Sequence, residues 1–146
     1  MMNADEFSER LWDFAAEVAL FVEMLPDTRV GRHVVSQLLR SGTSPAPNYD
    51  EACVAESRRD FAHKVAVAAK EMRESRGWIR FSAKAKLVEW KQIHSLVDEA
   101  GQLLRMLAKS AQTARIRGDL KSEDKSREEG NDDSGALSMG NSHNDQ

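Results

Sequence analysis

Apolar residues recur along the chain at alternating spacings of four and three residues, beginning near the N-terminus. Because an α-helix completes a turn about every 3.6 residues, this spacing places the side chains on one face of an amphipathic helix. A second stripe widens that face beyond what one neighbouring helix needs to cover. The main stripe contains Phe7, Leu11, Phe14, Val18, Phe21 and Leu25, and the second contains Trp12, Ala15, Ala19 and Val22. We expect Pro26 to end this helix, since proline cannot continue the hydrogen-bond ladder.

The next stretch has an apolar helical pattern but conflicting signals in its middle. Thr28 is a suitable N-cap for a second helix. Gly42 can end a helix by adopting a positive φ, whereas the pair Ser44–Pro45 can begin one as N-cap and first helical position. We interpret residues 28–56 as one long element with a break or kink near Ser41–Pro47. Two separate helices are the alternative, and the local signals leave both open.

Two further helices follow. Ser57 and Asp60 resemble a capping box at the start of the third, and the fourth is expected to end near Arg117 and Gly118. The third buries Phe61, Val65, Ala68, Met72, Ser75 and Ile79, and the fourth buries Leu87, Trp90, Ile93, Val97, Ala100, Leu104, Leu107, Ala111 and Ala114. Four amphipathic elements with short connections predict an all-α protein, an antiparallel up-down-up-down four-helix bundle over residues 1–117.

Charge is distributed unevenly along the sequence. The net charge of −3 combines −6 in residues 1–27, +6 in 28–86, +2 in 87–117 and −5 in 118–146. The last of these segments is rich in Gly, Ser, Asn, Asp and Glu and has few apolar residues. Such a composition cannot bury enough surface to offset the entropy of ordering the chain. We therefore predict a disordered acidic C-terminal tail over 118–146.

Composition excludes several classes of protein. No apolar run approaches the roughly 20 residues needed to span a bilayer, and no signal peptide is visible at the N-terminus. The single cysteine, Cys53, excludes an intramolecular disulfide and suits a reducing compartment. We expect a cytoplasmic protein that makes no membrane contact.

The sequence contains no recognisable catalytic constellation. A di-iron bundle needs a Glu-x-x-His motif on each of two helices, and the nearest approximation is Asp60 followed by His63, without a second copy. Cys53 lies between alanine and valine residues and is interpreted as a small buried packing residue. No glycine-rich phosphate loop is present. We expect no catalytic residues, no metal site, no cofactor and no enzymatic activity.

Basic residues of the second and third helices are the best candidates for binding an anionic partner. Arginine outnumbers lysine among them, and arginine suits phosphate recognition. The alternative is a solvated charged face, since Asp60, Glu71 and Glu74 lie within ion-pairing distance along the helix. The candidate nucleic-acid-binding residues are Arg40, Arg58, Arg59, Lys64, Arg73, Arg76 and Arg80.

Large aromatic side chains are candidates for contacts between copies of the chain. The first helix has more apolar surface than an isolated bundle requires, and burial of an aromatic often dominates such contacts. Tryptophan is more often a core or interface residue than a platform for stacking bases. The candidate interface residues are Trp12, Phe21, Trp78 and Trp90.

The middle of the chain carries a family resemblance. The residues that carry it are Gln37-Leu38-Leu39-Arg40-Ser41-Gly42-Thr43-Ser44, Asn48-Tyr49, Glu51-Ala52-Cys53, Ala55, Ser57, Asp60-Phe61, Lys64, Lys70-Glu71, Glu74 and Trp78. Together they resemble the 23S rRNA intervening-sequence protein family, also called four-helix-bundle proteins, over about residues 8–112. Pro45 and Pro47 depart from the family pattern, in which small or aliphatic residues are more usual.

The resemblance implies an up-down-up-down bundle that assembles into a ring, typically a pentamer. It also implies distant similarity to the accessory protein of diversity-generating retroelements, whose ring presents a basic surface to nucleic acid and a reverse transcriptase. No catalytic residues can be carried over. We therefore expect a non-enzymatic oligomeric assembly or adaptor protein whose partner is itself or another protein. The alternative function is RNA or DNA binding through the second and third helices.

Overall fold

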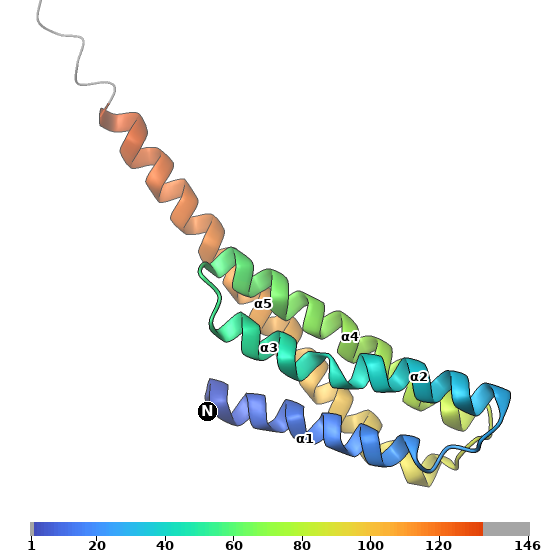
Figure 1. Ribbon diagram of the computed structural model, residues 1–146. Helices are drawn as coiled ribbons and strands as arrows, with labels where there is room; N and C mark the ends of the chain where they lie inside the picture. The colour runs from blue at the N-terminus through green and yellow to red at the C-terminus, as the bar shows by residue number, and fades with distance from the viewer. Residues whose placement is uncertain (1, 133–146) are drawn as a thin grey trace, which may run out of the picture.

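The computed structural model describes residues 2–132, which fold into an all-helical bundle (Figure 1). Its helices are α1 (Ala4–Val22), α2 (Arg29–Thr43), α3 (Pro45–Cys53), α4 (Arg58–Lys84) and α5 (Trp90–Asp132). Since α2 and α3 are the two parts of one kinked rod, the five segments make the four rods of the predicted up-down-up-down bundle. Within the described residues, no helix is long and apolar enough to cross a membrane.

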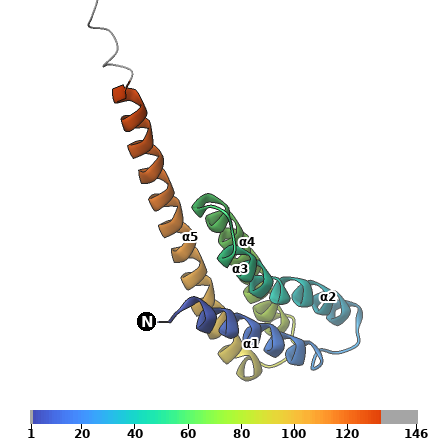
Figure 2. The same cartoon turned by 60° about the vertical axis from the view of Figure 1, so that its left-hand side comes forward.

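The neighbours of each helix define the cross-section of the bundle. Helix α1 packs against α2, α3 and α5, and helix α4 packs against the same three helices. No contact joins α1 and α4 in the part of the chain that is described. These two helices therefore occupy diagonally opposite corners, as the two views in Figures 1 and 2 show, and their outer faces point away from each other.

Polar side chains fix where the helices begin. The Thr28 hydroxyl accepts a hydrogen bond from the Gly31 amide at 3.1 Å, and the Ser57 hydroxyl accepts one from the Asp60 amide at 3.1 Å. Both caps were predicted. At the start of α1, Asn3 and Glu6 form a reciprocal capping box, which was not predicted. Each cap satisfies an amide that has no partner inside the helix.

The junction between α2 and α3 is a kink. Ser44, the single residue between them, has helical angles of φ −84° and ψ −35°, so the backbone does not leave the helical path. Pro45 and Pro47 lack an N–H and interrupt the hydrogen-bond ladder. The Ser44 hydroxyl donates back to the Arg40 carbonyl and does not cap α3. This geometry confirms one continuous kinked element and corrects the expectation that Ser44 is an N-cap.

Gly42 has a different role from the one predicted. No described glycine has a positive φ, and the helix continues past Gly42 to Thr43. A Cβ built on Gly42 would lie 2.8 Å from Cγ1 of Val18 on α1. The glycine is therefore needed for the close approach of α1 and α2, not for ending a helix.

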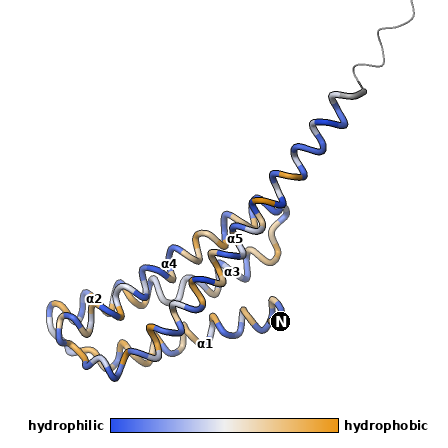
Figure 3. The backbone as a smooth tube through the Cα atoms, turned by 180° about the vertical axis from the view of Figure 1, so that it is seen from behind, coloured by the Kyte–Doolittle hydropathy of each residue, from blue (hydrophilic) through white to orange (hydrophobic). Residues whose placement is uncertain are grey.

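The core runs along the axis of the bundle. Figure 3 shows apolar segments on every helix, and the polar residues buried among them, such as Ser41 and Ser75, donate to carbonyls one turn earlier. The largest fully buried side chains are Phe14, Leu11, Leu38, Met72, Ile79, Ile93, Leu103, Leu107, Val18, Val34 and Val65, together with Pro45. Cys53 is exposed, so its interpretation as a buried packing residue is wrong.

Helix α5 continues beyond its predicted end near Arg117 and reaches Asp132. Residues 118–132, here called the arm, project away from the bundle in both ribbon views (Figure 2). Side chains from Asp119 to Gly130 are all exposed. The predicted disordered tail over 118–146 is therefore helical in its first part, and its remainder, 133–146, lies outside the described residues.

Candidate assembly and nucleic-acid surfaces

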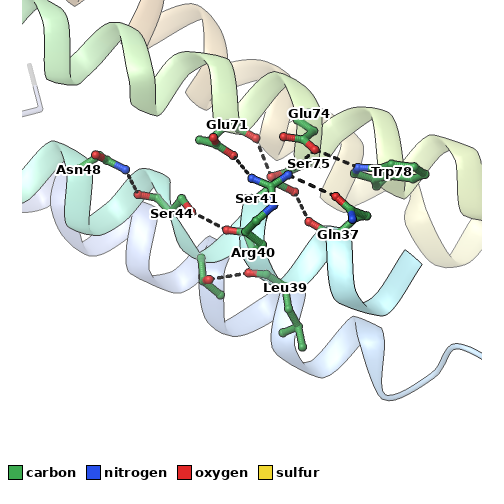
Figure 4. A network of polar contacts seen from close by, with 11 residues as sticks. Gln37, Leu39, Arg40, Ser41, Ser44, Asn48, Glu71, Glu74, Ser75 and Trp78 are labelled. Atoms are coloured by element: carbon green, nitrogen blue, oxygen red, sulfur yellow. Dashed lines mark hydrogen bonds and ion pairs between the residues drawn. The ribbon is translucent and has the colours of Figure 1, made fainter. Parts of the chain in front are cut away.

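Arg40 lies in a polar network between α2 and α4 (Figure 4). Its Nη1 donates to Oε2 of Glu71 at 2.9 Å, and its Nη2 donates to Oε1 of Glu74. The same oxygen of Glu74 accepts from the indole Nε1 of Trp78 at 3.4 Å. Arg40 was predicted to bind nucleic acid, but the structure engages its guanidinium with two carboxylates of the same chain.

The network shifts the titration of its members. Hydrogen bonding to Glu74 raises the pKa of Arg40, and the hydrogen bond from Arg40 holds the pKa of Glu74 below its usual value. A carboxyl with a lowered pKa contributes stability above its unfolded pKa and loses it as the pH falls through the folded value. The Arg40 network is therefore expected to weaken under acidic conditions.

Two other predicted phosphate ligands also have contacts of their own. Lys64 pairs with Asp60 at 3.3 Å along α4. Arg76 is partly buried and turns toward α5, where its Nε lies 3.5 Å from the position that a Cβ on Gly101 would occupy. The Nε of Arg76 has no hydrogen-bond partner among the described residues. Lys64 and Arg76 are therefore partly buried along the sides of α4.

The remaining basic residues of α4 form an exposed row, here called the basic ridge. It consists of Arg59, His63, Lys70, Arg73, Arg80 and Lys84, all exposed. Spacings of four, seven, three, seven and four residues place them on one side of the helix. No ion pair involves them in the described part of the chain. Arg58, also predicted, is exposed beside the start of the ridge.

The ridge is free because the carboxylates of α4 lie elsewhere. Glu71 and Glu74 are partly buried toward α2, where they pair with Arg40, and Asp60 pairs with Lys64. The predicted set of candidate residues omitted Lys70 and Lys84. Their helical spacing relative to Arg59, Arg73 and Arg80 is the signal that would have found them.

The diagonally opposite surface is apolar and acidic and is here called the α1 outer face. Its members are Trp12, Ala16, Leu20 and Met24, flanked by Glu9, Asp13 and Glu17. Leu20 is 72% exposed and Met24 is 50% exposed. The indole Nε1 of Trp12 donates to Oδ2 of Asp50 on α3 at 2.9 Å, so the ring is held in place while remaining 44% exposed.

The other aromatic interface candidates lie in different environments. Trp90, at the start of α5, is 57% exposed, so the prediction that the fourth helix buries it is wrong. Trp78 is partly buried and makes edge-to-face contacts with His33 and Phe81. Phe21 is 5% exposed and belongs to the core, which removes it from the interface candidates. Its position in the four-and-three pattern marked it as a core residue from the start.

The described residues contain no group of three or more His, Cys, Asp or Glu side chains arranged to hold a metal ion. His33, His63 and His94 are exposed and lie on three different helices.

Burial raises the pKa of Tyr49 to about 12, with Cys53 and nearby carboxyls adding to the shift. The phenol therefore remains protonated at neutral pH.

Comparison with known proteins places this fold in a family. Residues 6–109 match the family described as 23S rRNA-intervening sequence protein. The chain belongs to that family. A crystal structure from Bacteroides thetaiotaomicron, described as a protein with unknown function from the S23 ribosomal protein family, superimposes with a TM-score of 0.66. The sequences are 26% identical, and the match covers 70% of this chain and 95% of that protein. No match is found among curated proteins.

The match to the family covers most of the bundle but does not include the arm. The matched region ends at residue 109, whereas α5 continues to Asp132. Neither the family description nor that of the Bacteroides protein states an enzymatic activity.

Proposed function

We propose that the protein is a non-enzymatic assembly protein that associates with copies of itself. The observation that carries this proposal is the opposition of two complementary surfaces on one molecule. The α1 outer face is apolar and acidic, whereas the basic ridge of α4 lies at the diagonally opposite corner. An apolar centre flanked by charges that match a basic partner is typical of a specific protein interface.

The positions of the two surfaces determine the kind of oligomer. Two different patches that bind each other form a heterologous contact, which produces a closed ring or an open filament and not a two-fold dimer. The expected pentamer, a ring, is of this kind. We also propose that the protein is similar to the accessory protein of diversity-generating retroelements and that it is located in the cytoplasm.

Replacement of an exposed leucine tests the assembly. Leu20→Glu places a charge in the α1 outer face and is expected to lower the oligomer mass measured by light scattering. Val54→Glu is the matched control, because Val54 is 82% exposed at the turn between α3 and α4 and lies outside both surfaces. A monomer mass for the wild-type protein at micromolar concentrations would contradict the proposal. So would an oligomer that Leu20→Glu leaves intact.

Binding of RNA or DNA is the second candidate function, and the basic ridge favours it. A row of basic side chains on one helix face, none of which forms an ion pair within residues 2–132, is suited to the phosphate backbone. The residues of the ridge include no base-reading element, so binding there should be nearly independent of sequence and should weaken steeply with salt. Both proposals use the ridge, so a nucleic acid and a neighbouring subunit are expected to compete for it.

Fluorescence anisotropy with unrelated RNA and DNA oligonucleotides tests this function. The double variant Arg73→Gln, Arg80→Gln is expected to weaken binding by about tenfold or more, because each lost phosphate contact reduces both affinity and salt dependence. Arg29→Gln is the control, since Arg29 is an exposed arginine on α2 and is not a member of the ridge. Absence of binding at low salt would exclude the nucleic-acid function and leave self-assembly.

A further inference from the structure

A hollow of about 800 Å³ lies between the α3–α4 connection and α5, and is here called the turn hollow. Figure 1 shows this connection beside the point where α5 leaves the bundle. Apolar side chains from three parts of the chain line it, including Ala52, Phe61 and Met106. The volume falls within the range of roughly 300–1,000 Å³ that is usual for small-molecule sites.

The rim of the turn hollow is strongly basic. Arg58 comes from the first turn of α4, and Lys109 and Arg117 come from α5. The acidic member of the lining is Glu56. None of the three cations forms an ion pair within residues 2–132. The N-terminus of α4 adds a favourable dipole for an anion.

Hydroxyl groups complete the lining. Ser110 and Thr113 lie one turn apart on α5 and face the turn hollow. Their hydroxyls make no hydrogen bond in the described structure, whereas many other helical hydroxyls, such as that of Ser75, donate to a carbonyl four residues earlier. The turn hollow thus combines apolar surface, unengaged hydroxyls and three cations.

We propose that the turn hollow binds a nucleotide unit, either free or at the phosphorylated end of a nucleic acid strand. Phosphate oxygens would meet the guanidinium groups of Arg58 and Arg117, which offer paired donors that match phosphate geometry. The base would lie against Phe61 and Met106, because a planar ring gains by stacking on an aromatic side chain. The hydroxyls of α5 would bond the sugar or the edge of the base.

This ligand fits the lining better than other anions do. An acyl chain needs a closed apolar channel, whereas the turn hollow is open and carries Ser110 and Thr113 within it. Inorganic phosphate would leave Phe61 and Met106 without a partner. The inference deepens the second proposed function, because it places a strand end at a site separate from Arg73 and Arg80 of the basic ridge.

Cys53 provides a direct probe of occupancy. It is the only cysteine of the chain, it is exposed, and it lines the turn hollow. The rate at which its thiol reacts with a chromogenic disulfide reagent can therefore be followed without any substitution. With saturating adenosine diphosphate the rate is expected to fall several-fold, and with a 5′-phosphorylated oligonucleotide it should fall similarly. Adenosine alone and inorganic phosphate alone should protect the thiol weakly.

Substitution of the rim separates this site from the ridge. Arg58→Gln and Arg117→Gln are each expected to raise the Kd for adenosine diphosphate by about tenfold, the loss expected for one charge-assisted hydrogen bond. Arg29→Gln is the control that should leave it unchanged. Both rim residues are exposed, so the variants should retain the helical circular dichroism of the wild type.

The outcomes distinguish the two proposals. Oligonucleotide binding that Arg73→Gln weakens, without protection of Cys53 or an effect of the rim variants, would overturn the turn-hollow site and leave the ridge. Protection of Cys53 by adenosine diphosphate, without binding of unphosphorylated oligonucleotides, would support the turn hollow and count against the ridge. Failure of both nucleotide ligands to protect the thiol would overturn the inference.

Discussion

Single residues in this protein take their roles from what lies opposite them across the bundle. Gly42 and Gly77 are both helical glycines, but a Cβ on Gly42 would meet Val18 whereas a Cβ on Gly77 would meet nothing within 4 Å. Arg40 and Arg73 are both exposed arginines, yet two carboxylates pair with the first and no carboxylate of the described residues pairs with the second. Residue type alone does not separate these cases.

The two glycines predict stability changes of opposite sign. Gly42→Ala is expected to lower the free energy of unfolding by about 1–2 kcal/mol, because overpacking exceeds the gain in helix propensity. Gly77→Ala should raise it by up to about 1 kcal/mol through helix propensity. Urea denaturation monitored by circular dichroism measures both, and Val18→Ala should relieve the clash in the first variant. A stabilising effect of Gly42→Ala would contradict the close approach of α1 and α2.

The raised pKa of Tyr49 predicts that the folded protein loses stability at alkaline pH. The unfolded phenol ionises near its ordinary pKa of about 10, whereas burial raises the folded value to about 12. The folded chain retains a proton that the unfolded chain releases, so stability falls between these two values. Because Tyr49 is the only tyrosine, tyrosinate absorbance reports its titration directly. Tyr49→Phe should reduce the alkaline loss, and ionisation of Tyr49 in the folded protein near pH 10 would contradict its burial.

At the level of the element, α5 combines two different helices in one. Up to Ala114 it buries apolar side chains in the bundle, and from Asp119 to Gly130 it is exposed on all sides. Most helical stability in proteins comes from tertiary packing of an apolar face, and the arm lacks such packing. The arm contains the ion pair Lys125–Glu129 at 3.9 Å, and exposed pairs of this type contribute little.

Truncation after Arg117 tests this division. Removal of 118–146 is expected to leave the thermal midpoint of the bundle within a few degrees of the wild-type value, because no buried side chain of 118–130 is lost. The helical circular dichroism signal should fall by the contribution of the arm. A larger drop in the midpoint would show that the deleted region packs against the bundle.

At the scale of the whole molecule, charge is separated between opposite corners. The −6 of residues 1–27 lies largely on α1, and the basic ridge lies on α4, which α1 does not contact. The arrangement gives the molecule two unlike sides, as a heterologous assembly requires.

Self-association should therefore respond to salt. Raising the ionic strength from about 0.1 M to 1 M shortens the screening length from about 10 Å to about 3 Å and should weaken attraction between the two surfaces. Sedimentation velocity across this range is expected to show a lower oligomer fraction at high salt. A charge reversal that pairs Glu17→Lys with Arg73→Glu should restore part of the association lost in either single variant. Association that strengthens with salt would indicate an apolar contact without the proposed charge pairing.

The local pattern of the sequence determined the helices, their caps at Thr28 and Ser57, and most of the residues that form the core, because helical periodicity is a property of neighbouring positions along the chain. It wrongly placed Trp90 among the buried residues and did not include the fully buried Leu103. Only the tertiary structure decided whether the α2–α3 rod is continuous, why position 42 needs a glycine, whether Cys53 is exposed and which basic residues pair with carboxylates. Those properties depend on atoms that are distant in sequence: Arg40 meets Glu71 and Glu74, and Arg76 turns toward Gly101. The spacing of charges along one helix cannot reveal a partner that packing brings from another.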